Sequence, residues 1–286
     1  MKTCVSSYSF GDYIGEDKLG YLGIIDKAAE LGFDAIEYTE GAWSSDLSVA
    51  EKIRQRAADA GIAVAAYCVG ADFINGCGGD TKAEVERLKA HVDAAKALGA
   101  PMMRHDVAWG FHGRKYSIGY DDALAIVVDA IRELTEYAAS VGVKTMTENH
   151  GYFSQDANRV EKLINSVAHP NFGALVDLGN FMCADENPNI SVGIMAPYAF
   201  HVHAKDFFFK SGDGIHPGEG WFTTRAGNFI RGAIIGQGEA RVMQSLGILK
   251  RAGYDGYVSV EFEGMEDKLT GIRVGHDNLC RFLGMI

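Results

Sequence analysis

The chain has 286 residues, 47% of them hydrophobic and 23% charged, a balance typical of globular proteins that excludes an intrinsically disordered chain. Its formal net charge of −11 would repel a nucleic-acid backbone, and no basic stripe offsets that repulsion, so we expect no nucleic-acid partner. The N-terminal residues lack the apolar stretch of a signal peptide and no segment is suited to span a bilayer, so we expect a cytoplasmic protein without a membrane partner.

Eight short runs of apolar and β-branched residues recur along the chain, each followed by an amphipathic stretch. The predicted strands span 3–8, 34–38, 63–69, 102–107, 144–149, 173–177, 200–206 and 257–263. Apolar residues at three- and four-residue spacing predict helices over 82–98 and 123–140, with Asp80 or Thr81 and then Asp121 as N-caps. Eight such units without a linker predict one α/β domain over 1–286, a (β/α)8 TIM barrel rather than an open doubly wound sheet.

Residues 207–238 interrupt this alternation. The segment contains eight glycines and several aromatic residues, among them Trp221, and no clear helical or strand period. So long an irregular segment in a compact domain is typically a lid or a binding loop. We therefore expect it to lie over the mouth of the barrel.

Four residues with metal-binding side chains end four consecutive predicted strands. They are Glu148, Asp177, His203 and Glu261 on strands five to eight. Barrel active sites form at the carboxyl ends of the strands, and three carboxylates with one imidazole cannot neutralise one another. One divalent ion could hold all four, and this oxygen and nitrogen set suits Mn²⁺, Co²⁺, Zn²⁺ or Mg²⁺. The five cysteines stand singly, so we expect reduced thiols without a structural or nucleophilic role.

Short motifs in this order resemble the xylose isomerase-like TIM barrel superfamily, or sugar phosphate isomerase/epimerase group. They are Glu30-Leu31-Gly32-Phe33-Asp34-Ala35-Ile36-Glu37, Glu148-Asn149-His150, Asp177-Leu178-Gly179-Asn180, His203-Ala204-Lys205-Asp206 and 253–261. The resemblance implies a metal-dependent isomerase or epimerase of a ketose-like sugar. It further implies that Glu148 and Glu261 ligate the metal and exchange a proton with the substrate carbon next to its carbonyl.

Two departures from the family pattern leave a second reaction open. Asn180 stands where the epimerases usually have a histidine, and His150 stands where the xylose isomerases have a lysine. His150 is either a structural hydrogen-bonding residue or a general base beside the metal. The second possibility resembles the barrel subunit of C-glycoside deglycosidases, which act as lyases on 3-keto glycosides.

Further residues near predicted strand ends are candidates for contacts with the substrate. Lys205 could polarise a substrate oxygen or pair with a carboxylate. The candidate substrate-binding residues are His105, Glu37, Asn149, Asn180, Trp109 and Trp221. For His105 and Glu37, a structural hydrogen bond or an ion pair at the barrel rim is the alternative. Because no arginine cluster or phosphate-binding glycine loop follows strands seven and eight, an unphosphorylated sugar is favoured.

Two other classes of function share this sequence pattern. An AP endonuclease-like nuclease of the same superfamily needs a three-metal cluster rich in histidine and a surface that tolerates DNA, and the net charge disfavours it. A non-catalytic sugar-binding subunit is the other class, and a full ligand set would be unusual without chemistry. The sequence leaves the oligomeric state open, including a homo-oligomer.

Overall fold

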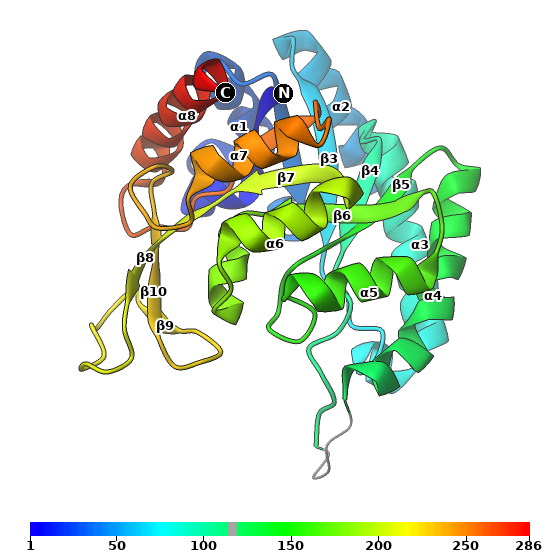
Figure 1. Ribbon diagram of the computed structural model, residues 1–286. Helices are drawn as coiled ribbons and strands as arrows, with labels where there is room; N and C mark the ends of the chain where they lie inside the picture. Colours follow the sequence, from blue (N-terminus) through cyan, green and yellow to red (C-terminus); the bar gives the residue numbers. More distant parts are fainter. Residues whose placement is uncertain (114–118) are drawn as a thin grey trace.

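Eight parallel strands close into one barrel in the computed structural model, which describes residues 1–113 and 119–286. The strands are β1 (Lys2–Ser6), β2 (Ala35–Thr39), β3 (Ala63–Val69), β4 (Met102–His105), β5 (Lys144–Glu148), β6 (Phe172–Asp177), β7 (Ala199–Ala204) and β11 (Tyr257–Val260). Around the barrel their order is β1-β11-β7-β6-β5-β4-β3-β2, so each strand lies beside its neighbour in the predicted series. The predicted (β/α)8 barrel is confirmed (Figure 1).

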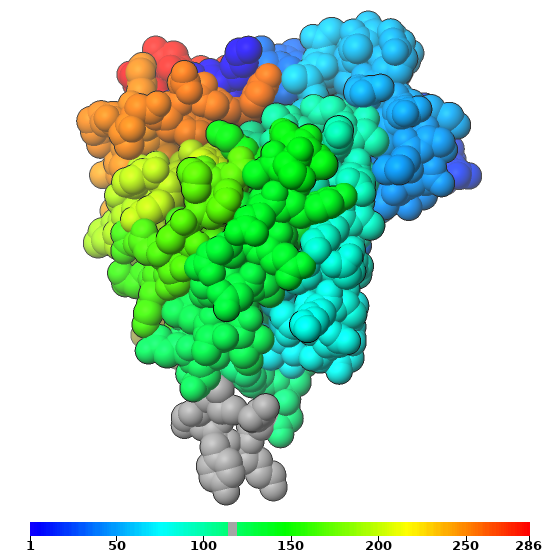
Figure 2. All heavy atoms as spheres, turned by 90° about the vertical axis from the view of Figure 1, so that its right-hand side faces the viewer, coloured from blue at the N-terminus to red at the C-terminus, as the bar shows by residue number. Residues whose placement is uncertain are grey.

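Helices form the outer layer of the barrel. They are α1 (Gly20–Glu30), α2 (Leu47–Ala60), α3 (Thr81–Leu98), α4 (Tyr120–Ser140), α5 (Ala157–Val167), α6 (Pro188–Met195), α7 (Val242–Arg251) and α8 (Lys268–Met285). Helices α3, α4 and α5 pack side by side and cover one flank of the molecule (Figure 2). Within the described part of the chain, none of the helices has the length and hydrophobicity to traverse a membrane.

The ends of the helices test the expected caps. Asp80 caps α3 and accepts the backbone N–H groups of Lys82 and Ala83, as predicted. The prediction of Asp121 as the cap of α4 is wrong, because that helix begins at Tyr120 and its N-cap is Gly119. The Asp122 carboxylate instead accepts the N–H of Gly119, 2.7 Å away, and lies in the first turn, where the helix dipole favours an acid.

Two small clusters of buried side chains fill the inside of the barrel. One contains Cys4, Ala35 and Ala65, and the other contains Ala66, Cys68, Met146 and Leu175, while most other apolar side chains pack between the strands and the helices. Cys4 and Cys68 are buried strand residues with free thiols, as predicted. The polar side chains at the carboxyl ends of the strands lie above these buried clusters, at the mouth of the barrel.

Residues 207–238 are not irregular throughout, so that expectation is wrong in part. About a third of the segment belongs to a separate three-stranded antiparallel sheet of β8 (Asp206–Lys210), β9 (Phe222–Thr223) and β10 (Phe229–Ala233), and turns join these strands. We call residues 206–240 the excursion; it projects from the barrel beside α6 (Figure 1). Glycines in left-handed turns, such as Gly227 with a φ of 88°, join strands that are short, and together they hide the strand period.

One carboxylate ties the base of the excursion together. Asp206 is buried and accepts four backbone N–H groups at 2.8 to 2.9 Å, from Phe207, Gly236, Gly238 and Ala240. Gly238 has to be glycine at this point, because a Cβ there would lie 2.3 Å from Asp206 Oδ1. The two ends of the excursion are therefore fixed to each other where they leave the barrel.

Candidate metal centre

Four neighbouring strands bring the predicted ligands together. Glu148 ends β5, Asp177 ends β6, His203 lies in β7 and Glu261 directly follows β11. One ligand atom of each lies within 4.8 Å of the other three, and all four side chains are buried. His203 Nδ1 lies 3.5 Å from Asp177 Oδ2, 3.4 Å from Glu261 Oε2 and 3.9 Å from Glu148 Oε1. We call these four residues the ligand cluster.

Two polar atoms at the centre of the ligand cluster lack hydrogen-bond partners. Among the described residues, none forms a hydrogen bond with Asp177 Oδ2 or His203 Nδ1, although both atoms are buried. An unsatisfied buried polar atom is costly, and a divalent cation between the two would satisfy both. Together with the oxygen and nitrogen donor set, these atoms make the ligand cluster a fit for a divalent metal.

Glu37 lies beneath the ligand cluster and orients the imidazole ring of His203. It is fully buried in β2, and the Nε2 atoms of His203 and His201 donate to it, at 2.9 Å and 2.8 Å. Burial by itself would raise the pKa of Glu37, but His203 and His201 outweigh burial and hold this pKa well below its usual range. Because Nε2 of His203 is taken, Nδ1 is the atom that faces the carboxylates. Glu37 therefore makes the ion pairs that were the alternative to its predicted substrate contact, and its side chain is sealed beneath the ligand cluster.

Two buried cationic side chains pair with the three carboxylates of the ligand cluster. Lys205 Nζ lies 2.6 Å from Glu261 Oε2 and 3.3 Å from Asp177 Oδ2, and Arg104 Nη2 lies 2.6 Å from Glu148 Oε2. Burial alone would raise the pKa of Glu261, but Lys205 and His203 hold it well below its usual range. Burial raises the pKa of Glu148, and Arg104 offsets only part of that effect. Lys205 thus pairs with carboxylates, as one of its two predicted roles required, and it also borders the cavity described below.

Asn180 links the two halves of this charge network. Its Nδ2 donates to Glu148 Oε1 at 2.8 Å, and its Oδ1 accepts from Lys205 Nζ at 3.2 Å. Asn149 faces elsewhere: its side-chain amide is bonded to the backbone N–H and C=O of Asp177, both at 2.9 Å. The Asn149 amide therefore holds the end of β6 in place, and its contact with the substrate stays a prediction.

The residues at the end of β4 lie on opposite sides of the strand. His105 is fully buried on the outer side of the strand, where its ring lies between Phe73 and Phe172 and its Nδ1 donates to the Asp106 backbone oxygen. Burial lowers the pKa of His105 to about 4. The bond to the Asp106 backbone oxygen is the structural hydrogen bond that was the alternative to a substrate contact of His105. Strand alternation turns Arg104 and Asp106 towards the mouth instead, and both were missed.

Asp106 holds His150 at the edge of the site. The Nδ1 atom of His150 lies 2.9 Å from Asp106 Oδ1, and Arg104 Nη2 lies 3.0 Å from the same oxygen. Among the described residues, no hydrogen bond occupies His150 Nε2, and the side chain is 36% exposed. The arrangement is a carboxylate-oriented imidazole with one free nitrogen at the mouth.

A cavity of about 360 Å³ lies over the ligand cluster. It is bordered by Glu148, His203, Glu261 and His150, and also by Tyr8 and Glu263, which the sequence analysis missed. Glu263 follows Glu261 by two residues, so the period of an extended chain would have placed it on the same side. Of the two predicted tryptophans, Trp109 borders an adjoining cavity, whereas Trp221 lies on the excursion near Lys210 and Arg231 and borders neither.

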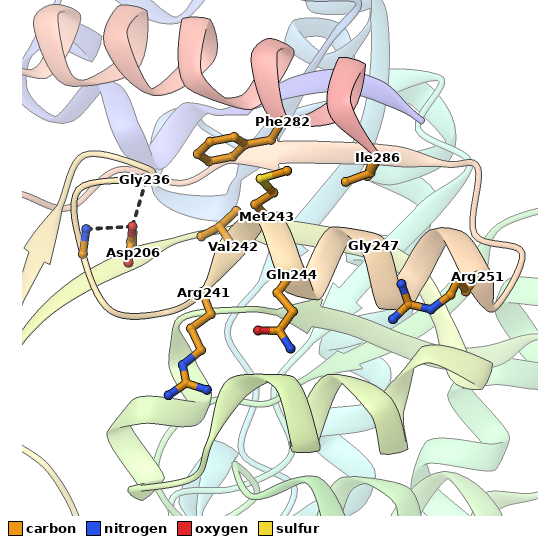
Figure 3. Close-up of a pocket in the computed structure, with 11 residues that line it drawn as sticks. Asp206, Gly236, Arg241, Val242, Met243, Gln244, Gly247, Arg251, Phe282 and Ile286 are labelled. Carbon is orange, nitrogen blue, oxygen red and sulfur yellow. Dashed lines mark hydrogen bonds between the residues drawn. The ribbon is translucent and has the colours of Figure 1, made fainter.

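A larger cavity, of about 540 Å³, lies away from the barrel mouth (Figure 3). It runs between α7 and α8, where Met243 and Phe282 face one another. Its one carboxylate, Asp206, already accepts four backbone N–H groups, and its described lining contains no imidazole or second acid. The chemistry of the molecule is therefore concentrated at the mouth.

Solved structures with a similar fold include enzymes and a metal complex. D-psicose 3-epimerase from Clostridium cellulolyticum H10, solved with D-tagatose, has a TM-score of 0.76 at 15% identity over 99% of each chain. The probable 3-DHS dehydratase AsbF from Bacillus anthracis has a TM-score of 0.74 at 19% identity, covering 98% of this chain and 99% of that one. A Xylose isomerase-like TIM barrel protein from Mycobacterium smegmatis in complex with magnesium has a TM-score of 0.72 at 18% identity, over 99% and 96% of the two chains.

At these identities the likeness establishes the fold. No curated protein matches the sequence. The family model described as Xylose isomerase-like TIM barrel matches residues 25–281, which is most of the chain and includes all four members of the ligand cluster. The chain therefore belongs to the Xylose isomerase-like TIM barrel family.

Proposed function

We propose that this protein is a divalent-metal-dependent epimerase or isomerase of a ketose-like sugar, and that the reaction proceeds by proton abstraction next to the carbonyl. The observation that carries this proposal is the ligand cluster, in which two glutamates border one cavity and two central atoms lack hydrogen-bond partners. The similar D-psicose 3-epimerase supports the choice of substrate class. Many reactions of this kind need a Lewis acid at the carbonyl oxygen, and a bound divalent ion supplies one.

The two glutamates divide the work of proton transfer in this proposal. Glu148 comes from β5 and Glu261 from the end of β11, and these strands are separated in the barrel by β6 and β7. The two carboxylates therefore approach the cavity from different strands, so that one can remove a proton from a carbon and the other can return it. Arg104 and Lys205 each hold one oxygen of these carboxylates and keep the side chains in position.

The cavity also fits a small polyhydroxylated molecule. Its volume of about 360 Å³ lies near the lower end of the range for small-molecule sites, about 300 to 1,000 Å³. Its polar border supplies hydrogen-bond donors and acceptors for hydroxyl groups, such as Arg104, His150 and Glu263. We propose the excursion as the wall that limits access to this cavity, because Phe222 and Gly220 border the adjoining space.

The test replaces Glu261 by Gln. The substitution keeps the size and one coordinating oxygen but removes the basic atom on that side of the substrate. We expect Glu261→Gln to lower the rate of solvent-proton exchange into a ketose, followed by NMR in D₂O at saturating Mn²⁺, by about 10²- to 10⁴-fold. Glu266→Gln is the matched control, because Glu266 pairs with Arg231 outside the ligand cluster. A Glu261→Gln protein that keeps most of the exchange rate would contradict the proton-transfer role.

One observation favours a second reaction at the same site. The pair of Asp106 and His150 places a free imidazole nitrogen at the mouth, as a general base for β-elimination would require. The second candidate function is therefore a metal-dependent lyase acting on 3-keto glycosides. Turnover of a 3-keto glycoside by two variants separates the two reactions. The lyase is favoured if His150→Ala abolishes this turnover while Glu261→Gln retains it.

A further inference from the structure

The cavity over the ligand cluster continues into a second space of similar size. This space, which we call the side lobe, measures about 380 Å³. It shares the border residues Tyr8, His150, Lys205 and Glu263 with the first cavity, so the two are contiguous. A molecule held over the ligand cluster could therefore extend into the side lobe.

Four aromatic side chains border the side lobe, together with polar residues and glycines. Tyr8, Trp109, Tyr152 and Phe222 line it, and they come from four separate parts of the chain. Tyr8, Trp109 and Tyr152 are 51%, 50% and 40% exposed. Large aromatic side chains are usually well covered, and a group of them left exposed around a cavity is typical of a binding site.

The backbone is adapted to hold two of these rings. Tyr152 has a φ of 61°, a left-handed conformation that is strained for an aromatic residue. Its N–H donates to Gln155 Oε1 at 2.5 Å and its hydroxyl donates to the Thr223 backbone oxygen at 2.8 Å, which fixes the ring between the barrel and the excursion. Beside it, Gly151 has a φ of 78°, and a Cβ there would lie 3.1 Å from the Trp109 ring.

Most polar groups that border the side lobe already have partners. Gln155 Nε2 donates to the Asn180 backbone oxygen at 2.8 Å, and the Asn180 amide bonds Glu148 and Lys205. Lys205 in turn lies 3.6 Å from Glu263. Beside His150 Nε2, to which no described residue hydrogen-bonds, and the Glu263 carboxylate, the side lobe offers a ligand the faces and edges of aromatic rings, which bind planar apolar groups.

We propose that the side lobe binds an aromatic group carried by the substrate, so that the substrate is an aryl-substituted sugar rather than a free ketose. The sugar part lies over the ligand cluster and the aryl group lies among Trp109, Tyr152 and Phe222. The inference rests on the proposed function only for the sugar part. It holds for an epimerase and for a lyase alike.

The test is a comparison of two glycosides that differ only in the substituent. Isothermal titration calorimetry measures the binding of phenyl β-D-glucopyranoside and methyl β-D-glucopyranoside to metal-free and Mn²⁺-loaded protein. We expect the phenyl compound to bind about tenfold more tightly in both forms, since aromatic contacts add to the area that is buried. Trp109→Ala, and independently Phe222→Ala, should remove most of this ratio and leave the affinity for the methyl compound unchanged.

Trp221→Ala is the matched control, because Trp221 is a tryptophan on the excursion that borders neither cavity. Equal affinities for the two glycosides, no binding of the phenyl compound, or an equal effect of Trp109→Ala and Trp221→Ala would each overturn the proposal. The readout is a binding equilibrium without turnover. If proton exchange is absent, the proposed function fails but the affinity ratio still tests the side lobe. If the affinity ratio is absent, the side-lobe proposal fails but the proposed exchange reaction is unaffected.

Discussion

Replacing Asp177 by Asn tests the metal centre with little disturbance of the fold. Asp177 Oδ1 accepts the N–H groups of Gly179 and Asn180, both at 2.8 Å, whereas Oδ2 is the buried oxygen without a hydrogen bond. An asparagine can keep the first oxygen and place an NH₂ group where the second stood. The variant should therefore keep the two hydrogen bonds to the backbone after β6 and lose one metal ligand.

The size of the expected effect follows from linkage. A ligand present at about 100 times its Kd stabilises the folded state by about 2.7 kcal/mol. The entropy of unfolding is about 2.1 cal/mol/K per residue, which gives about 0.6 kcal/mol/K for a chain of 286 residues. Saturating Mn²⁺ should therefore raise the Tm of the natural protein by about 4 to 5 °C.

Differential scanning calorimetry with and without Mn²⁺ measures this shift. We expect Asp177→Asn to reduce it to less than about 1 °C and to lower the metal-free Tm, because the substitution removes a carboxylate that pairs with the buried Lys205 ammonium 3.3 Å away. Glu84→Gln is the matched control, since Glu84 is a buried carboxylate that pairs with Arg87 outside the ligand cluster. It should lower the Tm itself and keep the metal shift. An unchanged shift in Asp177→Asn would refute the assignment of the metal centre.

Two further predictions concern buried groups away from the ligand cluster. Asp206→Ala leaves four backbone N–H groups without their acceptor, so the free energy of unfolding in urea should fall by about 3 kcal/mol or more, and a loss below about 0.5 kcal/mol would contradict this. Burial lowers the pKa of His105 from 6.5 to about 4. Between these two pH values the unfolded chain binds a proton at His105 that the folded chain does not bind. The free energy of unfolding therefore decreases as the pH falls from 6.5 to about 4. The His105 contribution should be about 2 kcal/mol smaller at pH 5 than at pH 7, and His105→Leu should flatten the urea-unfolding profile between these values.

The parts of the molecule that follow from local periodicity could be predicted from the sequence. Strands β3 and β6 carry nearly continuous apolar runs, and the ligand cluster could be found because Glu148, Asp177, His203 and Glu261 lie near the ends of consecutive predicted strands. Strands β1, β4, β7 and β11 end earlier than predicted, since the polar residues that follow them leave the sheet to form the mouth.

Residues whose role depends on side-chain direction were harder to predict. At the end of β4, imidazole chemistry favoured His105, but the alternation of the strand points His105 outwards and Arg104 and Asp106 inwards. Glu37 does point inwards, yet it lies below the ligand cluster because its position along β2 is one layer deeper than the mouth. The sheet of the excursion escaped prediction because its strands pair through turns rich in glycine.

The carboxylate of Asp206 fixes the base of the excursion next to the centre that the excursion borders. Asp206 accepts the N–H groups of residues 236, 238 and 240. The start of the excursion is therefore hydrogen-bonded to its end. His203 and Lys205 lie on the barrel side of these hydrogen bonds, whereas Phe222 and Trp221 lie beyond them. Midway along the excursion, the Tyr152 hydroxyl donates to the Thr223 backbone oxygen and the Thr224 hydroxyl donates to Asp185, so the outer wall of the cavity is tied to the barrel at its middle as well as at its base.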